Sequence, residues 1–166
     1  MPRISLNAPC PCHSGKKGKG CCAPYLAGTP APTAEALMRS RYAAYATGDA
    51  GYIIATTHPA SPHAEPERAA WAEGIREFSA QVKFLGLDVE LAETSGDTAV
   101  VQFLATLDRG GVDASFRERS AFERVGGRWL YREGQPQPTE PSADAGSSAD
   151  RSWSRRLTTR PPARRA

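Results

Sequence analysis

The sequence has no long apolar run and none of the short signatures of the commonest enzyme sites. Among its 166 residues no apolar stretch approaches the roughly 20 residues of a membrane-spanning helix, so we expect no membrane span. A Ser/His/Asp nucleophile elbow, a phosphate-binding loop and a dinucleotide-binding glycine fingerprint are all missing. The glycine pairs at 110–111 and 126–127 are typical of hairpin turns. The sequence therefore predicts no nucleotide site and contains no complete catalytic set.

A secretory signal is also missing from the first residues. Residues 1–9 hold one basic side chain, Arg3, and no apolar segment of the kind that such signals need. We therefore expect the chain to be cytoplasmic, in a compartment that keeps thiols reduced.

Cysteine is absent from the whole sequence except for residues 10–22, which hold four. Cys10 and Cys12 form one pair and Cys21 and Cys22 the other, and the eight residues between the pairs are rich in glycine and lysine. Such a segment can turn back and bring the pairs together, and four thiolates are the tetrahedral set typical of structural zinc. We predict one structural zinc ion at these four cysteines, with no open position for a substrate.

Disulfides and redox-active thiols are the alternatives for these cysteines. Four cysteines allow three disulfide pairings, but neighbours such as Cys21 and Cys22 rarely bridge each other, and a bridge from Cys10 to Cys12 would close a strained ring. Reducing conditions favour a metal over both alternatives. The ligand types leave zinc and iron open, although the closed set favours zinc.

The neighbours of the cysteines fit a metal in this segment. Four thiolates and one zinc ion leave an excess of negative charge, which Lys16, Lys17 and Lys19 can offset. We expect His13 to be a loop residue, because four thiolates already fill the coordination sphere. The segment has almost no apolar core, so we expect a chelator to unfold residues 1–26 and to leave the rest folded.

The spacing Cys-x-Cys-x-Ser-Gly-x(5)-Cys-Cys resembles the SEC-C zinc motif, which occurs at the C-terminus of the SecA translocase and in many other bacterial proteins. Beyond the cysteines, five residues match its usual pattern: Pro11, Ser14, Gly15, Lys16 and Lys17. His13 departs from the pattern, because a glycine is common at that position. The resemblance implies a docking or stabilising module whose zinc is not catalytic.

Charge is distributed unevenly along the chain. Residues 1–26 carry four basic and no acidic side chains, residues 27–134 eleven basic and fifteen acidic, and residues 135–166 six basic and three acidic. The acidic balance of the middle argues against a nucleic-acid groove there, and leaves only weak electrostatic contacts by the two ends.

The C-terminal stretch 135–166 is predicted to be disordered. It is rich in proline, serine and arginine, and only Trp153 and Leu157 are large and apolar, too few to offset the entropy lost on ordering. Its arginines fit a solvated tail without a partner. The alternative is a tail that binds RNA or an acidic surface.

Helices precede strands in the predicted order of elements between the ends. After a Pro/Gly linker at 27–32, apolar spacing predicts helices over 36–46, 49–58 and 67–78, with Thr33 and Asp49 as N-caps and Gly48 ending the first. Strands are predicted over 82–91, 99–107, 116–125 and 128–133. This order predicts an α+β domain with helices on one face of a curved antiparallel sheet, so the predicted units are residues 1–26, 27–134 and 135–166.

The middle of the chain resembles a known family as well. The segments 38–45, 55–59, 117–122 and 127–131 are similar to the YchJ-like family of bacterial proteins, which carry an N-terminal SEC-C motif. The resemblance implies that residues 27–134 adopt the nuclear transport factor 2-like (NTF2-like) cone fold. It implies a fold and a metal rather than a reaction.

A cone of this type encloses a pocket between its helices and the concave face of its sheet. On the strand 116–125, Glu118 and Ser120 share a face with two phenylalanines, and a buried glutamate needs a partner. His58 and Tyr42 are the candidate partners from the helices. The site is therefore either a ligand pocket with His58 and Glu118 as an acid–base pair, or a structural hydrogen-bond network.

Two functions follow from these residues. The first is a zinc-binding adaptor whose cysteine segment docks a protein partner, with the zinc in a structural role. The second is a small enzyme or a small-ligand binder that uses Tyr42, His58, Glu118 and Ser120 in the cone pocket. The sequence does not decide whether the chain is an enzyme, and the missing catalytic set favours the first function.

Overall fold

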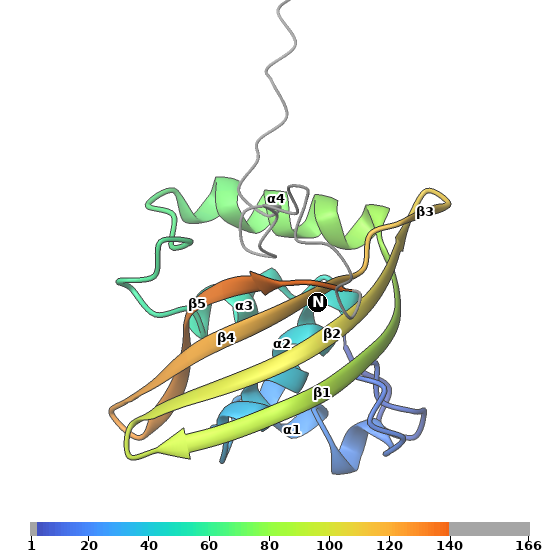
Figure 1. Ribbon diagram of the computed structural model, residues 1–166. Coiled ribbons are helices and arrows are strands. Elements are labelled where there is room, and N and C mark those ends of the chain that lie inside the picture. The colour runs from blue at the N-terminus through green and yellow to red at the C-terminus, as the bar shows by residue number, and fades with distance from the viewer. Residues whose placement is uncertain (1–2, 140–166) are drawn as a thin grey trace, which may run out of the picture.

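The structure, a computed structural model, describes residues 3–139 (Figure 1). The helical elements are a 3₁₀ turn η1 (Gly18–Gly20), α1 (Ala23–Leu26), α2 (Ala34–Thr47), α3 (Ala50–Ala55) and α4 (Arg68–Gln81). The strands are β1 (Lys83–Ser95), β2 (Thr98–Arg109), β3 (Val112–Asp113), β4 (Phe116–Val125) and β5 (Arg128–Gln137). None of the described helices is both long enough and apolar enough to cross a membrane.

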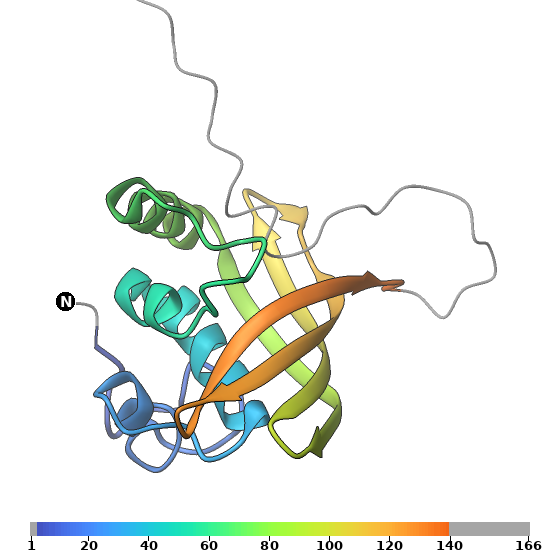
Figure 2. The ribbon, with the colours of Figure 1, turned by 90° about the vertical axis from the view of Figure 1, so that its left-hand side faces the viewer.

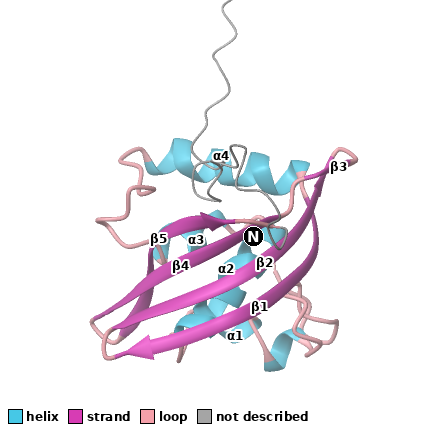
Figure 3. Ribbon diagram, viewed as in Figure 1, coloured by secondary structure: helices cyan, strands magenta, loops and turns pink. Residues whose placement is uncertain are grey.

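The strands form one antiparallel sheet in the order β1-β2-β4-β5, and the short β3 pairs with the end of β2. The sheet curves, and α2, α3 and α4 all lie on one side of it (Figures 2 and 3). On β4 the side chains of Phe116, Glu118, Ser120 and Phe122 are buried, while the alternate ones are half-buried. The predicted α+β architecture, with helices on one face of a curved antiparallel sheet, and the face of this strand that points inward are confirmed.

Local chemistry sets the ends of α2 and the start of α3 as the sequence predicts. Thr33 Oγ1 accepts a hydrogen bond from the Ala36 amide at 3.0 Å, and Asp49 Oδ1 accepts one from the Tyr52 amide at 3.1 Å. Gly48 ends α2 with a φ of 74°, in the left-handed region where glycine carries no Cβ penalty. These caps satisfy backbone groups that the helix itself leaves unpaired.

The prediction that the second helix continues to His58 is wrong, because α3 ends at Ala55. Beyond it Thr57 forms a parallel bridge with Tyr131 of β5. The His58 amide donates to the Tyr131 carbonyl at 2.8 Å, and the Tyr131 amide donates to the Thr56 carbonyl at the same distance. Backbone groups that a longer helix would have used internally are therefore paired with the sheet edge.

The last strand is longer than predicted, so the predicted start of the tail at Gln135 is wrong. Gln135, Pro136 and Gln137 pair with residues 117–119 of β4. Proline is tolerated there because β5 is an edge strand and needs no donor on its open side. Residues 140–166, the remainder of the predicted tail, lie outside the described residues.

Candidate functional site

The four cysteines come together in a single cluster. Their Sγ atoms all lie within 4.8 Å of one another, with 3.4 Å between Cys12 and Cys21 and 3.7 Å between Cys21 and Cys22. A tetrahedral zinc site with Zn–S bonds of about 2.3 Å places its sulfurs roughly 3.8 Å apart. Cys10, Cys12 and Cys22 are buried and Cys21 is half-buried. The donor set therefore fits a four-coordinate metal ion enclosed by protein.

A tight loop and a short helix hold these sulfurs in place. The Cys10 amide donates to the Lys16 carbonyl at 2.8 Å, and Pro9 bridges Lys17, which folds the first pair of cysteines into a hairpin. Cys22 is the N-cap of α1, and its carbonyl accepts from the Tyr25 and Leu26 amides. We call residues 3–26 the knuckle. Its regular structure is limited to two very short elements, η1 and α1, and backbone hydrogen bonds of the loop bring the two pairs of cysteines together.

His13 shows why the motif usually has glycine at this position. It has a φ of 58°, in the left-handed region that a side chain disfavours. Its Nε2 lies 3.0 Å from the carbonyl oxygen of Phe84, and its ring meets the Tyr42 ring edge-on. The imidazole therefore ties the knuckle to β1 and lies outside the cluster of four sulfurs.

Hydrogen bonds within the cluster separate the pKa values of its thiols. Those from Cys10 and Cys22 lower the pKa of Cys12, while the hydrogen bond with Cys12 raises the pKa of Cys10 to about 11. The pKa of Cys22 is raised by its hydrogen bonds with Cys10 and Cys12 and by burial. Four thiolates cannot ionise side by side without a cation, so metal binding must displace these protons.

Ser14 contacts the cysteine cluster, and three lysines lie on the same loop. Ser14 Oγ accepts from the Lys16 amide at 3.2 Å and lies 3.1 Å from Cys21 Sγ, to which it can donate when that sulfur is a thiolate. Such hydrogen bonds orient and stabilise a thiolate ligand. Lys16, Lys17 and Lys19 are exposed on the loop.

Tyr42 joins the knuckle to the cone and does not line the cone pocket. Its hydroxyl donates to the Gly86 carbonyl at 3.0 Å, and its ring packs edge-on against Phe84 and His13. The side chain is fully buried, and burial raises its pKa. The prediction that Tyr42 partners Glu118 is therefore wrong, because its position on α2 turns it toward β1 and the knuckle instead.

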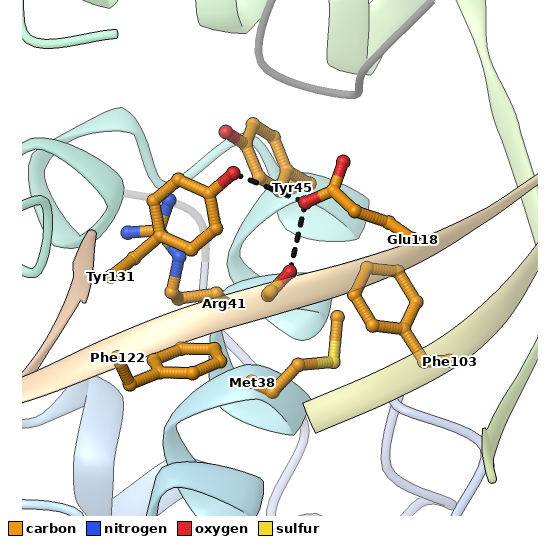
Figure 4. Close-up of a pocket in the computed structure, with 8 residues that line it drawn as sticks. Met38, Arg41, Tyr45, Phe103, Glu118, Phe122 and Tyr131 are labelled. Carbon is orange, nitrogen blue, oxygen red and sulfur yellow. Dashed lines mark hydrogen bonds between the residues drawn. The ribbon is translucent and has the colours of Figure 1, made fainter. Parts of the chain in front are cut away.

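The cone pocket is small and centres on Glu118. It contains a cavity of about 20 Å³, room for about one water molecule. Glu118 is 1% exposed, and its Oε1 accepts from Ser120 Oγ at 2.8 Å and from the Tyr131 hydroxyl at 3.1 Å (Figure 4). The remaining lining comes from Met38, Arg41, Tyr45, Phe103 and Phe122. Glu118 and Ser120 thus share the pocket as predicted.

His58 does not join Glu118. Its Nε2 lies 3.4 Å from Oε2 of Glu123, and its Nδ1 accepts from the Ala60 amide at 2.9 Å. Glu123 has the opposite parity to Glu118 on β4, so the two carboxylates belong to opposite faces of the strand. The predicted acid–base pair is therefore wrong, because the end of α3 leads His58 to the sheet edge rather than into the pocket.

Two residues beside Glu118, Arg41 and Gly134, were not predicted from the sequence. Arg41 Nη1 donates to the Ile53 carbonyl at 3.1 Å, and its Cζ lies 4.6 Å from the Tyr131 ring centroid. A Cβ on Gly134 would lie 1.9 Å from Glu118 Oε1, so only glycine leaves room for the carboxylate. The spacing of Met38, Arg41 and Tyr45 along one helix face was the available signal.

The comparisons with known proteins agree with this architecture. Residues 33–134 match the family described as the YchJ middle NTF2-like domain. A UPF0225 protein of Xanthomonas oryzae pv. oryzae is 42% identical over 133 residues, which cover 79% of this chain and 97% of that protein. A UPF0225 protein of Chromobacterium violaceum is 42% identical over 132 residues, with coverages of 76% and 92%.

Solved structures of SEC-C proteins have the same fold. The solution structure of a SEC-C motif-containing protein from Rhodopseudomonas palustris has a TM-score of 0.65 at 39% identity, and the match covers 80% of this chain and all of that one. The crystal structure of a SEC-C motif-containing protein from Psychrobacter arcticus has a TM-score of 0.63 at 23% identity, with coverages of 81% and 84%. The chain therefore belongs to the YchJ-like family, with an NTF2-like middle domain behind a SEC-C-type cysteine cluster.

Proposed function

We propose that the chain binds one zinc ion through Cys10, Cys12, Cys21 and Cys22, and that the folded knuckle docks a protein partner. The observation that carries this proposal is the closed cluster of four sulfurs within 4.8 Å of one another. Because protein ligands fill all four positions, the ion has a structural role. We infer that the protein works in a reducing compartment such as the cytoplasm, where the thiols stay available to the metal.

The surface of the knuckle supports a docking role. Lys16, Lys17 and Lys19 are exposed, and residues 3–26 carry no acidic side chain. The side chain of Leu6 is 57% exposed. It lies next to the lysine loop, as the hydrogen bond from the Lys19 amide to the Leu6 carbonyl shows, at 3.0 Å. A basic loop around one exposed apolar side chain suits an acidic protein surface with a small apolar spot.

Metal content tests the first half of the proposal. Protein purified without added metal is expected to contain one zinc ion per chain by elemental mass spectrometry, and the Cys10→Ser variant to contain little or none. Metal-free wild-type protein with four titratable thiols would contradict the proposal and make the cysteines a redox site.

Charge reversal on the knuckle tests the second half. Affinity capture with the Lys16→Glu/Lys17→Glu variant is expected to lose the partner proteins that wild type retains, because both lysines are exposed and neither is a ligand. Arg76→Glu, on the exposed side of α4, is the matched control. Equal partner sets for all three folded proteins, each with one zinc ion bound, would exclude docking through this loop.

A small-ligand or enzymatic role of the cone pocket is the second candidate. The buried Glu118, held by Ser120 and Tyr131, is the observation that favours it, because buried carboxylates cluster at functional sites. The cavity of about 20 Å³ means that a ligand larger than water must first displace side chains such as Met38. Screening small molecules against wild type and Glu118→Gln by thermal shift tests it; a ligand of this pocket must lose its shift in the variant.

A further inference from the structure

A second and larger groove lies where the knuckle, the linker and the cone meet. It has a volume of about 320 Å³, at the lower end of the range for ligand pockets. Its walls are α1 and residues 28–31 on one side and α3 with the start of β5 on the other. In Figure 2 the tip of the β4–β5 hairpin lies beside these N-terminal segments. The groove shares no lining residue with the pocket around Glu118.

Aromatic rings and one carboxylate give this groove its chemistry. Tyr25 of α1 and Tyr52 of α3 line it with half-buried side chains, while Trp129 of β5, also in the lining, is 5% exposed and has Arg124 over its ring. Grooves built from aromatic rings bind polyproline II segments, because prolines hold their backbone in the bound form in advance and present flat apolar faces. Asp49, which is half-buried at the groove, favours a basic residue beside the prolines. Arg128, at the start of β5, disfavours a basic residue close to its own side chain.

We propose that the segment Arg160-Pro161-Pro162 of this same chain docks in the groove, with its prolines on the rings of Tyr25 and Tyr52 and Arg160 at Asp49. The sequence contains a single Pro-Pro pair, and it is flanked by arginines at 160 and 164. This segment lies outside the described residues and beyond the part of the chain that matches the family, residues 33–134. The prolines thus match the tyrosine rings and Arg160 matches Asp49, whereas Arg128 repels a basic residue.

The chain is long enough to return to the groove. β5 begins at the groove with Arg128 and Trp129 and ends at Gln137, about 30 Å further along the strand. From Thr139, the last described residue, to Arg160 an extended chain spans up to about 70 Å. Covalent tethering also raises the local concentration of the segment, to the order of millimolar for short linkers, so a weak contact is enough.

The test uses the indole N–H signal of Trp129 in spectra of the full-length protein. Replacing both prolines, Pro161→Ser with Pro162→Ser, is expected to shift this signal, and adding a synthetic peptide of residues 157–166 to that variant is expected to return it to the wild-type position. Pro141→Ser, in the same C-terminal stretch but outside the Pro-Pro pair, is the matched control and should leave the signal in place. Neither change alters a residue of the described fold.

Asp49→Asn examines the charged end of the groove. Asparagine caps a helix as well as aspartate does, so α3 should remain intact while the negative charge is lost. The variant is expected to bind the peptide about two- to fivefold more weakly, as for a partly exposed ion pair. Identical Trp129 signals in wild type and the double proline variant would overturn the proposal. So would a wild-type signal that moves on dilution, which would place a second copy of the chain in the groove.

Discussion

The knuckle and the cone are stabilised by different means. In the knuckle the buried residues are chiefly Ile4, Gly18 and three of the cysteines, and its regular elements span three and four residues. In the cone each fully buried apolar side chain contributes roughly 1.5–3 kcal/mol, and the residues that do so include Leu37, Ile53, Ile75 and Phe103. The comparison teaches that one chain can combine a unit organised around a cluster of cysteines with a unit that depends on hydrophobic burial.

The two units are nevertheless packed together. Ile4, Cys10, Cys12 and Cys22 belong to the same continuous cluster of buried residues as the core of the cone. Tyr42 and His13 form the joint between them. The knuckle is therefore not an independent appendage, and changes at the cysteine cluster should alter the stability of the cone.

Metal removal should produce the largest difference in stability between the knuckle and the cone. Structural zinc contributes on the order of 10 kcal/mol to folding of small zinc-binding units, far more than the knuckle's apolar contacts. We expect a chelator, or Cys10→Ser, to unfold residues 3–26 while the sheet persists. The melting temperature of the cone should fall by roughly 5–10 °C, because Tyr42 loses its contact with the folded knuckle. Hydrogen exchange resolved by segment and circular dichroism measure both. Loss of the sheet together with the knuckle would show that the distinction between the regions is wrong.

Gly134→Ala is expected to have the next largest effect, and to act on the cone alone. Its Cβ would lie 1.9 Å from Glu118 Oε1 and 2.7 Å from the Tyr131 hydroxyl, so the buried network must shift, at about 3 kcal/mol of unfolding free energy.

Urea unfolding measures the effect of Gly134→Ala. Gly51→Ala, within α3, is the control. Its Cβ would lie 3.7 Å from Asp49 Oδ1, an ordinary contact distance, so the substitution should leave the free energy of unfolding unchanged or raise it slightly. Unchanged zinc content in both variants is expected, and zinc loss in Gly134→Ala would contradict the separation of the regions.

Tyr42→Phe tests the joint between the regions. It removes the hydrogen bond to the Gly86 carbonyl, worth about 1 kcal/mol, and keeps the ring contacts with Phe84 and His13. We expect a loss of that size for the cone and no change in zinc stoichiometry. Tyr42→Ala, which also removes the ring, should lower the stability of both regions. If it affects only one of them, Tyr42 does not couple them.

The smallest expected effect concerns the outer face of the sheet. Hydrogen bonds from Gln102 and Arg117 lower the pKa of Glu90 in the folded state. The ionised Glu90 therefore stabilises the folded state at pH values above its unfolded pKa. This stabilisation is lost in acid, as the pH falls through the lower pKa of the folded state. Because the pair is partly exposed, it should amount to a few tenths of a kcal/mol. Glu90→Gln should therefore narrow the stability difference between about pH 7 and about pH 3, and a wider difference would contradict the assignment.

The sequence was most informative where chemistry is local. Four cysteines within thirteen residues predict their own cluster, and the caps at Thr33, Gly48 and Asp49 depend on neighbours a few residues away. Alternation along β4 placed Glu118 and Ser120 on the inner face for the same reason.

The partners of Glu118 could not be found in this way. Tyr131 and Gly134 are three residues apart, so simple alternation would place them on opposite faces of β5. An irregularity in the pairing, in which Phe122 faces Tyr131 while Ser120 faces Gly134, brings both onto the inner side. The same holds for His58, whose position follows from the bridge between Thr57 and Tyr131, more than 70 residues apart in the chain.

The sequence by itself therefore determined the cluster of four cysteines, the order of helices and strands, and the inward face of β4, because each depends on spacing within one segment. Only the tertiary structure decided that Tyr42 serves the joint, that Glu118 binds Ser120 and Tyr131 rather than His58, and that a groove opens between the knuckle and the cone. Those features depend on strand register and on contacts between distant segments, which local patterns do not encode.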